Sequence, residues 1–366
     1  LYTRPRRFGK TLNMSMLYYF FSINEKENSY LFDGLNISKN KDALKVQNKY
    51  PTIFISLKEM KSQTFNAQIS SFSNVIYELL EKNLEILSSD QLSDTTRDIL
   101  NKLHNRLSSI EDLKISLRVI TNALYTYYQQ KVIVLIDEYD VPLQAAYQNN
   151  YYEEMVEFLR SVFSSALKTN DALEKGVMTG CLRISKESIF TGLNNFNVLS
   201  VTSVQFDEYF GFTDEEVKKI LSYYQIETQY DVIKEWYDGY QFGKENIYCP
   251  WDVINYIADY LNDPQMQPKL YWLNTSGNYI IRQLIKRADA NMREEIEQLI
   301  AGQSICKEIK IELTYKDLDI LEYGDNDASR NNLWSILYTT GYLTTRTCDG
   351  RKYELTIPNR EIHDIF

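Results

Sequence analysis

The sequence predicts an α/β fold in which a mostly parallel sheet is flanked by helices, followed by a helical region and a C-terminal module of helices and one hairpin. Three observations support this prediction: strands alternate with helices up to about residue 203, helical patterns dominate from Thr213 onward, and two alternating runs flank Asp349-Gly350. We therefore expect an α/β domain and two smaller regions, with the bounds 1–205, 206–305 and 306–366.

Residues 1–22 predict a strand, a loop and a helix in that order. Leu1–Thr3 resemble the end of a strand, and apolar residues from Leu12 to Phe20 recur at helical spacing. The chain begins on an apolar and aromatic pair, without an initiator Met. We therefore expect residue 1 to lie mid-strand in a fragment that lacks upstream residues.

Further strands and helices alternate along the α/β domain. The run TIFISL (52–57) and the apolar run 132–136 are typical of strands buried in a parallel sheet. Another strand is predicted over 176–184 and a short one over 198–201, and the polar residues 36–49 predict a connector. The 3.6-residue recurrence of apolar residues predicts helices over 65–87, 95–107, 110–129 and 151–169.

The C-terminal half carries two local signals. Thr213 with Glu216 three residues later is a capping box, which predicts a helix start. Asp349-Gly350 between two alternating runs predicts a hairpin, and two helices followed by a hairpin are typical of a winged-helix module. Helices are expected over 252–261, 277–288, 292–300, 313–321 and 330–339.

The composition describes an acidic globular chain and excludes several classes of protein. Of 366 residues, 40 are Lys or Arg and 50 are Asp or Glu, so the net charge is −10 and the pI is about 5.0. A protein whose main task is to neutralise nucleic-acid phosphates needs surplus basic residues. No apolar run approaches the roughly 20 residues of a membrane span, so no membrane partner is expected.

Cysteine and histidine usage argues against structural zinc. Four Cys residues lie far apart without a CxxC pair, and the chain has two His residues. Scattered thiols are typical of a reducing compartment, so we expect a cytoplasmic protein. The acidic total hides one basic cluster, because the first eleven residues contain no acid but include Arg4, Arg6, Arg7 and Lys10.

The segment RPRRFGKT (4–11) resembles a phosphate-binding loop, because it lies between a strand end and an amphipathic helix. In such a loop, backbone N–H groups at the helix start bind phosphates, a Lys reaches the β- and γ-phosphate oxygens, and a hydroxyl binds Mg²⁺. Gly9-Lys10-Thr11 matches this pattern. Arg4 replaces the first Gly, and a Cβ there resists close phosphate approach. We expect a reshaped loop in which Arg6 and Arg7 add positive charge.

A second motif stands at the end of an apolar strand. In VIVLIDEYD (132–140), Asp137 fits the acid that holds the Mg²⁺ shell, and Glu138 fits the acid that polarises the attacking water. The alternative is that these acids lie in a solvated turn after the strand and have no catalytic role. The phosphate-loop pattern upstream favours the first interpretation.

The next strand offers two more candidates for nucleotide chemistry. Thr179 lies where a polar residue senses the γ-phosphate in related nucleotidases. Arg183 is a candidate sensor or arginine finger that would stabilise transition-state charge. The alternative for Arg183 is a surface or salt-bridge residue.

The chain resembles the bacterial AAA-ATPase-like family in six blocks that cover nearly its whole length in order. They are TRPRRFGKT, LIDEYDVPL, TGCLRISKESIFTGLNN, FDEYFGFTDEEV, WYDGYQFG with YCPWDVINY, and LYTTGYL. The resemblance implies a P-loop NTPase-like fold with ATP and Mg as cofactors. In that family the loop itself begins Arg-Pro-Arg-Arg, so Arg4 departs from the general motif and not from the family.

The motifs and the resemblance together give a set of site residues. The predicted catalytic residues are Glu138, Lys10 and Arg183. The predicted Mg²⁺ ligands are Thr11 and Asp137. The predicted nucleotide-binding residues are Arg6, Arg7, Phe8, Gly9, Lys10, Thr11 and Leu12.

Members of that family often carry a C-terminal PD-(D/E)XK nuclease-type domain, and this chain stops about where that part would begin. We predict an ATP-binding, Mg-dependent ATPase that serves as a switch for an attached nuclease-like effector, with ATP and ADP as ligands. The alternative is a non-hydrolysing scaffold with a degenerate loop that binds protein or DNA. DNA contact through the missing domain or the winged-helix-like module, and homo-oligomer formation, stay open.

Overall fold

The computed structural model describes residues 1–366 except 183–188, 190–195, 273–288, 314–326 and 351. The chain forms two compact units. The first contains Leu1–Tyr2, Thr11–Gly180 and the described residues of 184–197, and the second contains Thr3–Lys10, Cys181–Leu182 and Val198–Phe366. The predicted division into three regions stays a prediction.

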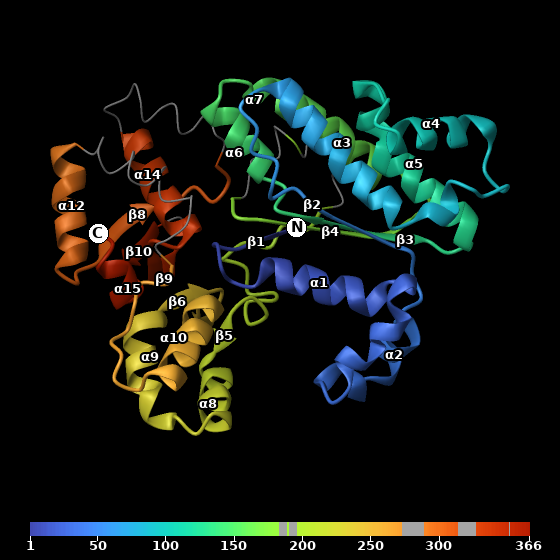
Figure 1. Cartoon of the computed structure of the whole chain (residues 1–366). Helices are drawn as coiled ribbons and strands as arrows, with labels where there is room; N and C mark the ends of the chain where they lie inside the picture. Colours follow the sequence, from blue (N-terminus) through green and yellow to red (C-terminus); the bar gives the residue numbers. More distant parts are fainter. Residues whose placement is uncertain (183–188, 190–195, 273–288, 314–326, 351) are drawn as a thin grey trace. The chain divides into compact units, whose positions relative to one another are not determined.

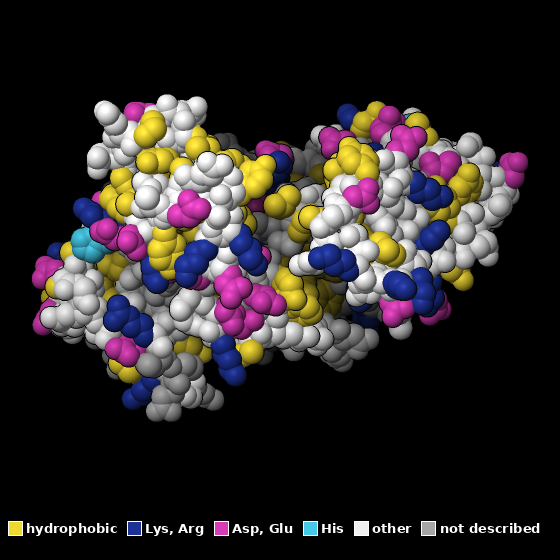
Figure 2. Space-filling view, turned by 90° about the horizontal axis from the view of Figure 1, so that it is seen from below, with side chains coloured by type: hydrophobic (Ala, Val, Ile, Leu, Met, Phe, Trp, Pro, Cys, Tyr) yellow, Lys and Arg dark blue, Asp and Glu magenta, His cyan; other side chains and the backbone are white. Residues whose placement is uncertain are grey.

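The surface carries charges of both signs. On the face drawn in Figure 2, the basic and acidic side chains of the described residues are interspersed rather than gathered into one basic area. Within the described part of the chain, no helix is both long and apolar enough to cross a bilayer.

A four-stranded sheet forms the centre of the first unit. Its strands are β1 (Tyr2–Thr3), β2 (Thr52–Ser56), β3 (Val132–Asp137) and β4 (Leu173–Gly180), in the order β1-β4-β3-β2. Strand β3 pairs in parallel with both β2 and β4. The parallel sheet confirms the predicted α/β class, and because β3 is central, its C-terminal residue Asp137 lies between the ends of two neighbouring strands.

Helices cover both faces of this sheet (Figure 1). On one face, Met14 of α1 (Lys10–Phe21) packs against Ile133 and Leu135 of β3. Residues alternate along a strand, so Val134 and Ile136 point to the opposite face. The helices of that opposite face, with their connecting elements, are α3 (Phe65–Glu81), η3 (Leu84–Ile86), α4 (Asp94–His104), α5 (Ile110–Tyr128), α6 (Val141–Gln148) and α7 (Tyr152–Leu167).

Two sequence predictions, one for the first unit and one for the second, were wrong in detail. The predicted polar connector 36–49 contains two short helical elements, η2 (Asn36–Lys39) and α2 (Lys41–Val46), and η1 (Ile23–Phe32) precedes it. The helix α2 begins here because the Asn40 side chain caps it by accepting from two backbone N–H groups. The predicted strand 198–201 is reduced to a single bridge at Leu199, whose carbonyl accepts from the Thr3 N–H at 3.0 Å.

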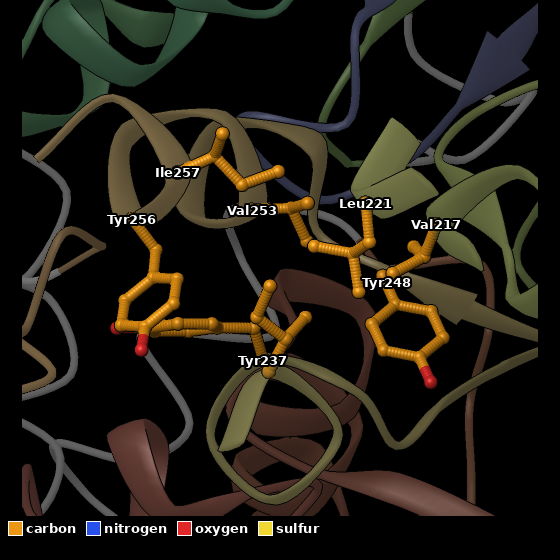
Figure 3. Close-up of a cluster of buried hydrophobic side chains, with 8 residues drawn as sticks. Val217, Leu221, Tyr237, Tyr248, Val253, Tyr256 and Ile257 are labelled. Atoms are coloured by element: carbon orange, nitrogen blue, oxygen red, sulfur yellow. The ribbon is translucent and has the colours of Figure 1, made fainter. Parts of the chain in front are cut away.

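The second unit begins with a small antiparallel sheet and helices. The sheet has the order β5-β7-β6, and the capping box of Thr213 and Glu216 starts α8 as predicted. An aromatic core fills this part (Figure 3), with Tyr237, Tyr248 and Tyr256 among its buried members. The elements are β5 (Phe212–Thr213), α8 (Asp214–Tyr223), η4 (Glu227–Gln229), α9 (Tyr230–Tyr237), β6 (Tyr240–Phe242), β7 (Glu245–Tyr248) and α10 (Pro250–Asn262).

The C-terminal part has a second antiparallel sheet with the order β8-β10-β9. Lys352 pairs with Asp349, which confirms the predicted hairpin. The predicted helix 277–288 and all but the first residue of the predicted helix 313–321 lie outside the described residues. The elements are α12 (Ala290–Ile300), β8 (Ile305–Glu308), α14 (Asp327–Thr340), β9 (Thr344–Asp349), β10 (Lys352–Thr356) and α15 (Arg360–His363).

Candidate functional site

Asp137 is held between two hydroxyl groups at the C-terminal edge of the sheet. The Thr11 hydroxyl donates to one carboxylate oxygen at 2.7 Å, and the Thr179 hydroxyl donates to the other at 2.5 Å. The Asp137 side chain is fully buried. Each of these residues stands at an element end: Thr11 in the first turn of α1, Asp137 at the end of β3 and Thr179 near the end of β4. The parallel sheet therefore brings the two predicted Mg²⁺ ligands together.

Glu138 follows Asp137 in a left-handed backbone conformation. Its φ is 52°, which is uncommon for a residue with a Cβ and costs about 1 kcal/mol or more. The conformation is held from both sides, since the Tyr139 N–H donates to the Thr179 carbonyl and the Val141 N–H donates to the Glu138 carbonyl. Strain of this kind concentrates at functional sites, and here it turns the chain sharply at the predicted catalytic acid.

The loop before α1 curls around the Lys10 ammonium. Lys10 Nζ donates to the carbonyl of Arg4 at 3.0 Å and to that of Pro5 at 2.8 Å, and Cys181 Sγ lies 3.5 Å from it. Arg7 and Gly9 have positive φ angles of 71° and 74°, whereas Phe8 between them and the residues on either side have negative φ. Alternation of this type turns successive N–H groups toward one side and forms an anion-binding concavity.

Arg4 is a buried structural residue, which explains how the loop dispenses with the first Gly of the general motif. Its guanidinium donates to the carbonyls of Thr3, Leu199 and Phe206. It also lies 5.2 Å and 5.4 Å from the ring centroids of Phe210 and Phe242. The positive φ values fall at Arg7 and Gly9 and not at Arg4. Arg4 therefore needs none of the backbone freedom of glycine.

The other predicted nucleotide-binding residues occupy different environments. Phe8 is fully buried, with its ring centroid 4.9 Å from those of Tyr240 and Phe242, so only its backbone can serve a ligand. Leu12 is 64% exposed on α1, and Arg6 is half-buried. Arg183 lies outside the described residues. The binding and catalytic roles assigned to these residues stay predictions.

Several residues of the second unit contact the phosphate loop, and together we call them the loop receptor. The sequence analysis did not predict this receptor. Besides the contacts of Arg4 and Phe8, Gly341 makes room for Pro5, since a Cβ on Gly341 would lie 2.9 Å from Pro5 Cβ. Contacting residues come from three blocks of the family resemblance, FDEYFGFTDEEV, WYDGYQFG and LYTTGYL. The predicted core role of the block WYDGYQF is confirmed, because Tyr237, Tyr240 and Phe242 are buried. The sequence held no signal that paired these blocks with the loop.

The donor set at Asp137 fits Mg²⁺. This ion keeps several water ligands and is held by one or two protein oxygens together with substrate phosphates, so it needs no cage of carboxylates. Among the described residues there is no group of three or more His, Cys, Asp and Glu side chains that could hold a metal. Thr11 donates its proton to Asp137 and so keeps its oxygen lone pairs for a cation.

An open polar groove lies elsewhere in the second unit. It has a volume of about 890 Å³ and is lined by α12 and β8 residues, including Glu294, Glu295 and Lys307. Lys307 is paired with Glu295 at 2.5 Å, so opposite charges already satisfy one another there. The groove holds none of the predicted site residues, and we assign no chemistry to it.

Comparison with known proteins agrees with this geometry. A curated protein of Azotobacter chroococcum mcd 1, described as an uncharacterized protein in the vnfD 5' region, is 26% identical over 366 aligned positions. The alignment covers 98% of this chain and 60% of that protein, so the chain spans about three fifths of the relative's length. The model of the family AAA-ATPase_like, described as predicted AAA-ATPase, matches residues 1–190, which include the loop, Asp137 and Thr179. The chain therefore belongs to the AAA-ATPase-like family.

Proposed function

We propose that this protein binds ATP with Mg²⁺ at the loop and sheet edge around Thr11 and hydrolyses it. The observation that carries the proposal is the hydrogen bond from the Thr11 hydroxyl to Asp137, because a hydroxyl at a helix start beside a buried acid is the arrangement that holds the Mg²⁺ of a nucleoside triphosphate. The concavity formed at Arg7 and Gly9 supplies N–H groups for phosphate oxygens.

Each residue has a defined task in this proposal. Lys10 exchanges its two loop carbonyls for the β- and γ-phosphate oxygens, and Thr11 with Asp137 holds Mg²⁺. Mg²⁺ would neutralise charge on the phosphates. Glu138 accepts a proton from the attacking water. Thr179 fixes the orientation of the Asp137 carboxylate through its own hydrogen bond.

A role as a switch for an attached effector extends the proposal beyond this chain. The curated relative is longer than the chain, and the family resemblance implies that members often carry a C-terminal nuclease-type domain. The proposed ligands are ATP and ADP, and any DNA contact belongs to that additional part or to the C-terminal module. Among the described residues, Cys181, Cys249 and Cys306 form no disulfide, which supports a reducing, cytoplasmic setting.

We also propose that the C-terminal module is winged-helix-like. The order α12, β8, α14, β9, β10 and the sheet order β8-β10-β9 support this. Its helix α14 is an unsuitable groove reader, because Leu333, Trp334, Leu337 and their neighbours through Thr339 are all buried. A DNA-reading helix must expose one side to base edges. A packing or protein-contact role for this module is therefore favoured over DNA recognition.

Titration with MgATP tests the proposed site. Lys10→Ala removes the ammonium that would bind the phosphates, and we expect MgATP to bind at least about 100-fold more weakly, measured by calorimetry. Lys26→Ala is the matched control, because Lys26 is an exposed lysine on η1, and it should bind as the wild type does. Unchanged affinity in Lys10→Ala would contradict the site assignment.

The non-hydrolysing scaffold is favoured by one observation. Lys10 is only 4% exposed and already has two carbonyl partners, and Arg4 fixes the loop from inside, as expected of a loop kept for its structure. The scaffold predicts that the wild-type protein neither binds MgATP nor releases phosphate. The same titration, with a phosphate-release assay on the full chain, therefore decides between the two functions.

A further inference from the structure

A buried pair of carboxyl groups in the second unit faces Arg7 of the phosphate loop. Asp252 lies in the first turn of α10 and Glu361 in α15, and their side chains are 0% and 1% exposed. The Trp272 N–H donates to one Glu361 oxygen at 2.6 Å. Among the described residues, neither oxygen of Asp252 and only that one oxygen of Glu361 has a hydrogen-bond donor. Two unsatisfied buried carboxyl groups side by side are costly unless they share a proton.

Arg7 is fixed against the same helix. Its guanidinium lies 4.7 Å from the ring centroid of Trp251 and donates to the Tyr271 carbonyl. The Cys249 thiol lies 3.8 Å from the Arg7 carbonyl, as a weak donor. Arg7 has a left-handed backbone, so these contacts hold it in a conformation that a residue with a Cβ adopts only when its surroundings impose it. The loop concavity depends on that conformation.

The charges of this cluster indicate which acid pairs with Arg7. Burial lowers the pKa of Arg7, and of the acids that oppose this effect Asp252 acts most strongly. Burial raises the pKa of Asp252, and burial together with the Asp252 charge raises the pKa of Glu361. Because Asp252 interacts with the charge of Arg7 more strongly than Glu361 does, Asp252 carries the negative charge and Glu361 carries the proton near neutral pH.

The remaining titratable groups around the pair are neutral over the relevant range. Burial raises the pKa of the Cys249 thiol and of the phenols that face the pair from α9, β6 and the segment after α10. These groups keep their protons when the solution is made acidic. The described groups facing the pair from all packed elements are Arg7, Cys249, Tyr237, Tyr240 and Tyr271.

We propose that Asp252 and Glu361 are positioning residues for the phosphate loop, which they hold in its anion-binding conformation through Arg7, and that protonation of Asp252 releases the loop. This proposal rests on the proposed function, because it deepens the account of that nucleotide site. Acidification removes the only buried anion opposite Arg7 among the described residues. The loop then loses the charge attraction between Asp252 and Arg7, while the folded core, which no longer buries a charge, does not lose stability from this pair.

The first experiment follows MgATP affinity of the full chain between about pH 8 and about pH 5. We expect wild-type affinity to fall about five- to tenfold toward acid, as the charge attraction between Asp252 and Arg7 is lost. Asp252→Asn should already bind about five- to tenfold more weakly at pH 8 and show a smaller pH dependence. Asp231→Asn, an exposed acid on α9, is the matched control and should follow the wild type, so that titration of ATP itself cancels. An Asp252→Asn profile that coincides with the wild type overturns the proposal.

The second experiment needs no nucleotide and separates this proposal from the proposed function. Hydrogen exchange of the amides of residues 3–10 is compared between variant and wild type at each pH. We expect faster exchange in Asp252→Asn at pH 8 and a ratio that approaches one toward pH 5. A ratio of one at every pH overturns the positioning role, even if MgATP binds. If MgATP fails to bind to any form and the exchange pattern is found, only the proposed function fails.

Arg7→Met keeps the test decisive if Asp252→Asn does not fold. Arg7 is half-buried, and Met retains much of the packing of its methylene groups on Trp251. We expect Arg7→Met to give the same acceleration of loop exchange at pH 8 and the same reduced pH dependence. Unchanged exchange in this variant, with a wild-type circular dichroism spectrum, overturns the proposal.

Discussion

The sheet edge around Asp137 and the loop receptor around Asp252 both bury a carboxyl group completely, but they treat it in opposite ways. Asp137 accepts a hydrogen bond from Thr11 on one oxygen and from Thr179 on the other. Asp252 has no backbone N–H or hydroxyl donor among the described residues, and the groups that act on its charge are Cys249, the protonated Glu361 and Arg7. Hydroxyl donors favour the charged form of a carboxyl group, whereas burial without donors favours the proton.

The difference follows from the local architecture. Parallel strands end at the same edge of a sheet, so β3 and β4 place a carboxylate and a hydroxyl side by side, and the first turn of α1 adds another hydroxyl. The receptor contains aromatic residues that contact the loop, such as Tyr240, Phe242 and Trp251, and these provide apolar surface and few donors. The first site presents an oriented carboxyl group to a cation, and the second is suited to respond to pH.

The largest expected effect concerns the acid beside Asp137. Glu138→Gln removes the group that would accept a proton from water, and the amide keeps nearly the same shape. We expect phosphate release to fall about 1,000-fold while the dissociation constant for MgATP stays within about twofold of the wild type. Glu157→Gln on the exposed side of α7 is the control and should turn over normally. Full turnover in Glu138→Gln would remove this residue from the catalytic role.

The next largest effect concerns the receptor. Arg4→Met leaves the carbonyls of Thr3, Leu199 and Phe206 without their guanidinium donor in a buried setting. We expect the free energy of unfolding in urea to fall by about 3 kcal/mol. Arg118→Met, which changes an exposed arginine of α5, should cost less than about 0.5 kcal/mol. A comparably small loss in Arg4→Met would mean that the receptor does not hold the loop through Arg4.

Much of the first unit could be predicted from the sequence because its signals are local. The apolar run of β3 and the helical periodicity of α3 and α5 depend on neighbouring residues only. The observed bounds of β3 and α5 lie within one residue of the predicted ones, whereas α3 ends at Glu81 and the rest of the predicted helix 65–87 contains the short η3. The meeting of Thr11 and Asp137 could also be expected, since parallel strands and the helix that follows the loop determine it.

The receptor could not be predicted because its contacts join residues about 200 positions apart. Arg4 looked like a departure from a glycine position, and only the carbonyls of Leu199 and Phe206 reveal why a guanidinium stands there. Asp252 is the first residue of the predicted helix 252–261, a place where an exposed carboxylate is favourable. Its burial next to Glu361, more than 100 positions away in the chain, changes its chemistry.

A smaller effect is expected when the Asp137 site is made to resemble the Asp252 site. Thr179→Val keeps the shape of the side chain but leaves one buried Asp137 oxygen without a donor. We expect a loss of about 1–2 kcal/mol in the free energy of unfolding and a several-fold weaker MgATP affinity, measured in urea and by calorimetry. Thr126→Val on α5 is the control, as it alters a threonine outside the sheet edge. No loss in Thr179→Val would show that Asp137 needs only the Thr11 hydroxyl.

The smallest effect uses a third aspartate that has donors but is partly exposed. Burial acts against the charged form of Asp214, but hydrogen bonds from Lys218, Tyr230 and Tyr248 outweigh it and lower its pKa to about 2. The stabilisation is present above the ordinary aspartate pKa of 3.8 and is lost as the pH falls through about 2. Solvent screening reduces its size, so Asp214→Asn should cost about 1 kcal/mol at pH 7 and progressively less between about pH 4 and pH 2.

The loss in the free energy of unfolding is measured by urea unfolding at each pH and compared with that of Glu215→Gln, which changes an exposed neighbour on α8. A cost that does not shrink in acid would mean that packing of the two tyrosines, and not the carboxylate charge, is what Asp214 provides.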